Sequence, residues 1–224
     1  MVRRLVLALA VLIPWQASAG PCVPGTLQDY IDLGDPGCSL GALVAARFQL
    51  EAGQSFATPI DPHTVQMTPG GSPSAPRLVL SFDVAAAAGD LFESFFHFDA
   101  SAPALTGGVI QIDTASASGD GVVTATQDIC PDGLFLPGVP NGCPNPAASL
   151  VAFVTESNSG GDAAGISPAA SLFDVFVDVT VDGGLAGSAS LGAVSITLAP
   201  EPSAAQLLAS ALAPLALMRA RRPS

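Results

Sequence analysis

The sequence predicts an all-β fold centred on a single antiparallel β-sandwich with a jelly-roll-like arrangement. The first observation is that apolar and polar residues alternate with a period of two along many short segments, as in strands with one buried face. The second is that clusters of Gly, Pro, Asp and Ser separate these segments; the 224 residues include 23 Gly and 20 Pro. Several short strands with such turn residues between them are typical of a sandwich, and so many helix breakers disfavour long helices.

The clearest strand is predicted over 171–183. One side of it carries Phe173, Val175, Val177, Val179 and Val181, and the other carries Asp174, Phe176, Asp178, Thr180 and Asp182. We expect the first face to lie in the core and the second to be solvated. Seven further segments show similar alternation: 43–50, 77–84, 91–98, 109–113, 122–129, 149–155 and 194–198. The segment 26–33 is predicted to form either one helical turn or a short strand.

The composition indicates one folded domain over 20–199. Hydrophobic residues make up 49% and charged residues 12% of the chain, which excludes intrinsic disorder. The formal net charge is −12, and once both ends are removed only Arg47 and Arg77 face eighteen acids, a net charge of −16. Nucleic acid is therefore excluded as a partner, because phosphate binding needs a basic surface.

The first 19 residues are predicted to be a signal peptide. Arg3 and Arg4 form a basic region, 5–15 is apolar, and Ala17 and Ala19 stand at small-residue positions before a cleavage site. Signal peptidase is thus an expected partner, and the domain is expected to be exported.

The last 25 residues, 200–224, have three parts. Pro200, Glu201 and Pro202 precede an apolar segment at 204–218, and Arg219, Arg221 and Arg222 follow it. As a transmembrane helix the apolar segment would rise about 22 Å, short of the hydrocarbon core of roughly 30 Å. It is a marginal span, with its arginines on the cytoplasmic side and the domain across the membrane. A permanent single-span anchor is the alternative.

These three parts, in this order, resemble the PEP-CTERM sorting signal of Gram-negative bacteria. The resemblance implies that the tail holds the exported protein transiently in the inner membrane until an exosortase, a membrane cysteine protease, removes it. It also implies release to the cell surface or to an extracellular matrix of exopolysaccharide, as in a biofilm. The segment 27–41, with Gly37-Cys38-Ser39-Leu40-Gly41 and Phe48 after it, resembles the opening of a β-rich domain common among PEP-CTERM proteins. Near Cys130, Gln127 replaces an acid usual in such domains, and the resemblance implies no catalytic residue.

Four cysteines, Cys22, Cys38, Cys130 and Cys143, follow the export signal and predict two disulfide bonds. Three connectivities are open. We favour the local pairs Cys22–Cys38 and Cys130–Cys143, because each closes a short loop rich in Gly and Pro, worth about 3 kcal/mol. A zinc site is disfavoured because no two cysteines have the C-x₂-C spacing.

No catalytic constellation is evident. His97 shares a strand face with Glu93 and Asp99 and is interpreted as a surface or partly buried structural histidine, because no Gly-x-Ser-x-Gly motif supplies a nucleophile. The weakest alternative is a hydrolase using the carboxylates of Glu93, Asp99 and Glu156.

Calcium is considered as a structural ion. The stripe formed by Asp174, Asp178 and Asp182 is interpreted as a solvated face, since successive members lie about 13 Å apart along a strand. Loop acids are better placed for a structural calcium ion, although no EF-hand string is present: Asp113 with Asp120, Asp128 with Asp132, and Asp162. A calcium-dependent, lectin-like glycan-binding module is the second hypothesis. The leading one is a non-enzymatic exported surface or matrix protein without a cofactor.

Overall fold

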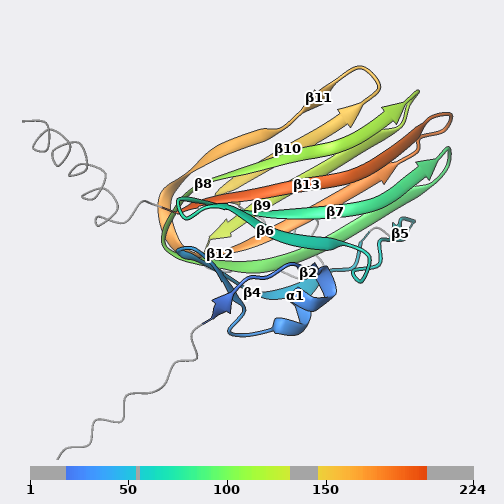
Figure 1. Cartoon of the computed structure of the whole chain (residues 1–224). Helices are drawn as coiled ribbons and strands as arrows, with labels where there is room; N and C mark the ends of the chain where they lie inside the picture. Colours follow the sequence, from blue (N-terminus) through green and yellow to red (C-terminus); the bar gives the residue numbers. More distant parts are fainter. Residues whose placement is uncertain (1–18, 54–55, 132–145, 201–224) are drawn as a thin grey trace, which may run out of the picture.

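The computed structural model describes residues 19–53, 56–131 and 146–200 (Figure 1). These residues form one short helix and thirteen strands, all joined in a single hydrogen-bonded sheet. Strand pairs are antiparallel except β1 with β3 and β5 with β8. The prediction of an antiparallel, nearly all-β fold is confirmed, and the jelly-roll-like sandwich stays a prediction.

The elements follow each other along the chain as β1 (Gly20–Pro21), β2 (Gly25–Thr26), α1 (Leu27–Leu33), β3 (Cys38–Leu40), β4 (Leu43–Leu50), β5 (Thr58–Pro59), β6 (Gln66–Ser72), β7 (Ala75–Ala87), β8 (Leu91–Ser118), β9 (Val122–Pro131), β10 (Ala148–Thr155), β11 (Ser159–Gly160), β12 (Asp162–Asp182) and β13 (Ser188–Pro200). The main path of the sheet runs in the order β11-β10-β9-β12-β8-β13-β7-β6-β2, and β4 pairs with β8 off this path.

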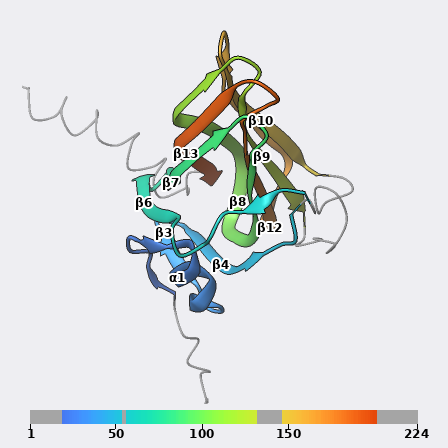
Figure 2. The same cartoon turned by 90° about the vertical axis from the view of Figure 1, so that its right-hand side faces the viewer.

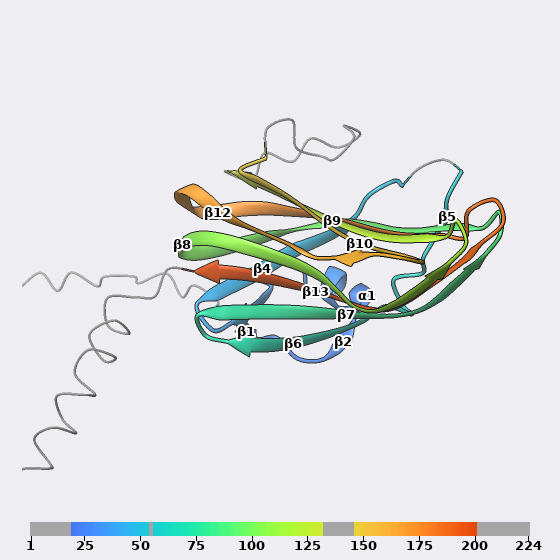
Figure 3. The same ribbon diagram turned by 90° about the horizontal axis from the view of Figure 1, so that it is seen from above.

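Two long strands, β8 and β12, make the sheet curl. The first part of β8 lies between β12 and β4, and its second part lies against β13. Strands β9, β10 and β12 therefore lie across from β13, β7 and β6 (Figure 3). The core fills the space between them: a Cβ added to Gly108 on β8 would lie 2.8 Å from Ile129 Cδ1 and 3.3 Å from Leu150 Cδ1. Glycine at this position lets the two parts of the sheet pack closely.

Most of the predicted strands are present. The segment 43–50 is β4, and the segments 77–84, 122–129, 149–155 and 194–198 lie within β7, β9, β10 and β13. The segments 91–98 and 109–113 are parts of one strand, β8, which continues through Pro103 and Gly107. Strand β6 was not expected because Pro69-Gly70-Gly71 is typical of a turn; near the edge of a sheet, proline and glycine are tolerated.

The segment 26–33 is helical. Thr26 caps α1: its Oγ1 accepts a hydrogen bond from the Asp29 amide at 3.0 Å, and Asp29 Oδ2 accepts one from the Thr26 amide at 2.7 Å. Such a reciprocal box stabilises a helix start. The helix lies beside β4 at one end of the molecule (Figure 2), where the Tyr30 ring stands 5.3 Å from that of Phe48.

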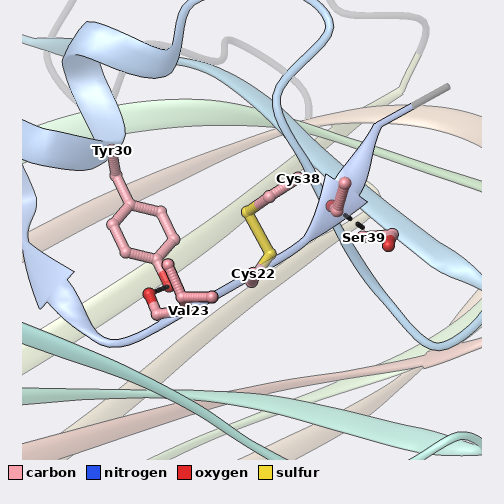
Figure 4. Close-up of a disulfide and its surroundings, with 6 residues drawn as sticks. Cys22, Val23, Tyr30, Cys38 and Ser39 are labelled. Atoms are coloured by element: carbon pink, nitrogen blue, oxygen red, sulfur yellow. Dashed lines mark hydrogen bonds between the residues drawn. A yellow bond between two sulfur atoms is a disulfide. The ribbon is translucent and has the colours of Figure 1, made fainter. Parts of the chain in front are cut away.

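One predicted disulfide is confirmed. Cys22 and Cys38 are bonded, with their Cα atoms 4.8 Å apart (Figure 4). The same region is held by hydrogen bonds from Tyr30 Oη to the Val23 carbonyl at 2.9 Å and from Ser39 Oγ to the Gly20 carbonyl at 3.2 Å. Cys130 is buried and also takes part in a disulfide. Cys143 lies outside the described residues, so the second expected pairing stays a prediction.

The predicted signal peptide, apart from Ala19, and the sorting tail beyond Pro200 lie outside the described residues. Within 19–53, 56–131 and 146–200, no helix has the length and hydropathy needed to cross a membrane.

Candidate functional site

The most unusual feature of the fold is a layer of buried ionisable side chains on the sheet face that points away from the core. Six residues on three neighbouring strands form it, five of them buried and Asp178 half-buried. We call them the acidic layer: Glu93, His97 and Asp99 on β8, Asp128 on β9, and Asp174 and Asp178 on β12. The register sets Asp99 opposite Asp174, with Phe176 opposite both His97 and Asp128. Alternation along each strand puts all six on one face.

The structure corrects the prediction that this face of β12 is solvated. Asp174 is only 3% exposed and Phe176 only 1%, while Asp178 is half-buried. The Phe176 ring packs edge-on against Phe95 of β8, with the ring centres 4.1 Å apart. The apolar face is buried as predicted, so both faces of β12 are buried from Phe173 to Val177.

His97 is held between two carboxylates. Its Nδ1 lies 3.0 Å from Asp174 Oδ1 and its Nε2 lies 3.4 Å from Glu51 Oε1. With 7% of its surface exposed, it is a buried histidine rather than a surface one. A carboxylate at each ring nitrogen fixes the orientation of the imidazole, and both nitrogens can donate only when the ring is protonated.

Asp99 forms an ion pair with Arg47, one of the two arginines in 20–199. Arg47 has φ of 53°, and the register of β4 on β8 shifts between Ala46 and Gln49. A β-bulge of this kind redirects a side chain, here toward Asp99. The left-handed backbone of a non-glycine residue costs about 1–2 kcal/mol, so the surrounding contacts must compensate for it.

Asp178 is the group whose protonation the fold changes most. Burial above all, together with the negative charges of Glu93 and Asp128 and against a hydrogen bond from Thr180, raises its pKa to about 6. Burial also raises the pKa of Asp128, partly offset by a hydrogen bond from Ser149. Asp128 Oδ1 is buried without a hydrogen-bond partner among the described residues. This part of the layer can therefore take up and release a proton near pH 6.

A cavity of about 490 Å³ opens beside the acidic layer, between β8 and the segment that joins β4 to β5. Three carboxylates line it, those of Glu51, Asp61 and Glu93, together with the apolar side chains of Leu50 and Ile60. Gly53 also lines the cavity, so close to Glu93 that an added Cβ would overlap Glu93 Oε2. One member of the acidic layer, Glu93, therefore lines this cavity.

The carboxylates proposed for a hydrolase are not brought together. Glu93 and Asp99 share a strand face but are six residues apart on β8, which is about 20 Å. Asp99 is paired with Arg47, and Glu156 is exposed in the turn between β10 and β11.

Two of the acids considered for calcium, Asp120 and Asp162, accept hydrogen bonds from backbone amides. Asp120 accepts hydrogen bonds from the amides of Leu185 and Ala186 at 2.8 and 3.0 Å, which lowers its pKa. Asp162 Oδ1 accepts one from the amide of Ala163. Asp128 lies in β9 rather than in a loop, and Asp132 lies outside the described residues. In the described part of the chain, no three His, Cys, Asp or Glu side chains are placed to hold a metal ion.

Sequence reasoning missed Glu51, Arg47 and the burial of Asp128. The sequence did contain a sign that strand 122–129 buries polar groups. Its core face reads Val123, Ala125, Gln127 and Ile129, so one polar residue stands among apolar ones. Gln127 is fully buried, and neither amide atom of its side chain has a hydrogen-bond partner among the described residues.

Comparisons of this chain with protein-family models, with curated proteins and with solved structures find no match.

Proposed function

We propose that this chain is an exported protein of the cell surface or extracellular matrix, without enzymatic activity, and that a PEP-CTERM-type tail and an exosortase deliver it there. The first strand and the Cys22–Cys38 disulfide, which follow directly after the predicted cleavage site, carry the proposal. Strand β1 starts at Gly20, directly after the predicted signal-peptide cleavage site, and β13 reaches Pro200, the first residue of the Pro-Glu-Pro motif and the last residue that the structure describes. Cleavage near these two points would leave every described strand intact.

The disulfide between Cys22 and Cys38 supports export. Disulfide bonds persist in oxidising compartments and are rare in the bacterial cytoplasm. This one lies only two residues after Gly20, where it holds the new N-terminus against β3. A chain that loses its signal peptide needs such a link, because first residues are poorly ordered unless they are tied down.

The partners of the ionisable groups support a structural role rather than catalysis. Asp99 is paired with Arg47, and His97 with Asp174 and Glu51. We infer that the curled sheet is a jelly-roll-like sandwich whose acidic surface keeps the protein soluble among acidic polysaccharides. Signal peptidase, exosortase and matrix exopolysaccharide are the partners that this account requires.

The experiment expresses the full chain in a Gram-negative host with an exosortase and in the same host with the exosortase gene deleted. We expect release into the medium in the first strain and retention in the inner membrane in the second. Glu201→Ala should be retained in both, whereas the matched variant Glu156→Ala, in an exposed turn, should behave as wild type. Equal release with and without the exosortase would contradict the proposed sorting.

A further inference from the structure

The second half of β8 has a strand partner on one side only. Residues 111–118 of β8 pair with β13, while β12 reaches β8 no further than Asp162 opposite Ile110. Within the described ranges, no strand pairs with the other edge of 111–118. Alternate residues of an antiparallel strand point their amide and carbonyl groups to opposite sides, so this edge presents backbone groups that can accept a further strand.

The free edge forms one wall of a groove, and the hairpin of β10 and β11 forms the other. Two cavities of about 430 and 490 Å³ lie along it, and Ile112, Val154 and Ser159 line both of them. The apolar side chains in the groove are half-buried and pack against the core: Ile112, Ala115, Ala117 and Val154. The groove therefore offers apolar contacts together with unpaired backbone.

The walls of the groove carry negative charge without a compensating cation. Asp113, Glu156 and Asp162 line it, and its lining contains no Lys, Arg or His among the described residues. The carboxylates are accessible on exposed residues, and two of them accept hydrogen bonds: Asp113 accepts one from Ser195 Oγ at 3.2 Å, and Asp162 Oδ2 accepts one from the Val151 amide at 3.4 Å. Asp162 Oδ1 also accepts the Ala163 amide. A second copy of this acidic chain would be repelled here, whereas a basic segment would be attracted.

We propose that this groove binds an extended basic segment of a partner protein, which adds as a strand to the free edge of β8. Ile112, Ala115 and Ala117 of β8 form the half-buried apolar row, and an outer row that includes Asp113 and Ser116 is exposed. A register irregularity against β13 between Ile112 and Thr114 brings Ile112 onto the same side as Ala115, and from Thr114 onward the side chains alternate regularly. The matching segment alternates small β-branched residues with Lys or Arg. Eight residues of free edge span about 26 Å, enough for a segment of seven residues. This inference goes beyond the proposed export and does not depend on it.

The test uses the oxidised domain 20–200 and a fluorescent seven-residue peptide of alternating lysine and valine with blocked ends, followed by anisotropy at 0.15 M salt, where charges are screened beyond about 8 Å. A second peptide has the same sequence but carries N-methyl groups on backbone amides along both of its edges. These groups prevent strand pairing through either edge and keep the charge. Circular dichroism of the domain, with thermal melts of each variant, establishes that it is folded.

The unmodified peptide should bind, and the N-methylated peptide should bind at least tenfold more weakly. The triple variant Asp113→Asn, Glu156→Gln, Asp162→Asn should bind about tenfold more weakly, since each exposed ion pair changes affinity by roughly up to fivefold. The matched triple variant Asp32→Asn, Asp35→Asn, Asp83→Asn, which removes the same charge from exposed sites elsewhere, should bind as wild type.

Three results would overturn the proposal. The first is the absence of binding by a folded domain. The second is equal binding of the N-methylated peptide or of spermine, which would show attraction of charge without strand addition. The third is equal weakening by the two triple variants, which would place the peptide on the acidic surface as a whole.

Discussion

Replacing Asp178 with asparagine should stabilise the protein at neutral pH. In the folded chain Asp178 titrates at a pKa of about 6, because it is buried beside Glu93 and Asp128, whereas its ordinary value is 3.8. Between these two values the unfolded chain has released a proton that the folded chain still holds. The free energy of unfolding contributed by this group is therefore complete below pH 3.8 and lost as the pH rises through 6. At about 1.4 kcal/mol per pKa unit, the loss is at most about 3 kcal/mol.

An asparagine side chain has nearly the same shape as that of aspartate and never ionises, so the substitution removes this loss. We expect Asp178→Asn to raise the free energy of unfolding by about 1–3 kcal/mol at pH 7 and to leave it nearly unchanged at pH 4. Urea unfolding followed by circular dichroism at pH 4.0, 5.0, 6.0 and 7.0 measures the difference between variant and wild type. Asp83→Asn, on an exposed position of β7, is the control and should show no such trend. A variant that is no more stable than wild type at pH 7 would refute the argument from burial.

Three further predictions concern single positions. Gln127→Leu should stabilise the protein by about 1–3 kcal/mol in urea unfolding, because the wild-type amide is fully buried without a hydrogen-bond partner among the described residues; Gln127→Glu should destabilise it, and the reverse order would contradict this reasoning. Cys22→Ser should cost about 3 kcal/mol by the same measurement, and adding a reductant should then have less effect than it has on wild type. Gly53→Ala should lower the melting temperature, since its Cβ would meet the carboxylate of Glu93; Gly70→Ala, where an added Cβ meets nothing within 4 Å, is the control.

The strands of the fold could be predicted because their information is local. Alternation at 171–183 identified the core face of β12. The capping box of α1 is formed by Thr26 and Asp29, which lie within four residues of sequence. The continuity of β8 could not be predicted, because Pro103 and Gly107 are ordinary turn residues. Gly107 is paired on both sides, with Gly165 of β12 and Ala199 of β13, and Pro103 lies between Ser101 and Leu105, which both pair with β12.

The acidic layer could not be predicted because its members meet only through long-range register. His97 contacts Asp174 from 77 positions away, and Arg47 reaches Asp99 from 52 positions away. Alternation shows that one face of a strand differs from the other, but not whether the polar face is covered. A face with Phe176 at its centre was a sign that it would be buried.

The groove beside β8 could not be predicted from local sequence either. Two of its acids, Asp113 and Asp162, were considered as loop ligands for calcium, yet what sets their surroundings is the point at which β12 stops pairing with β8, at Ile110. That point follows from the path of the whole sheet rather than from the residues around Asp113.

The central claim is that the functional form of this protein is the domain between two removable ends. Intact-mass spectrometry of the protein released by an exosortase-bearing host tests it most directly. The account predicts one species that begins at Gly20, ends close to Pro200 and is lighter by about 2 Da for each disulfide, the mass of the two hydrogen atoms lost per bond. A released species that still contains the apolar segment 204–218 and Arg219 would contradict it.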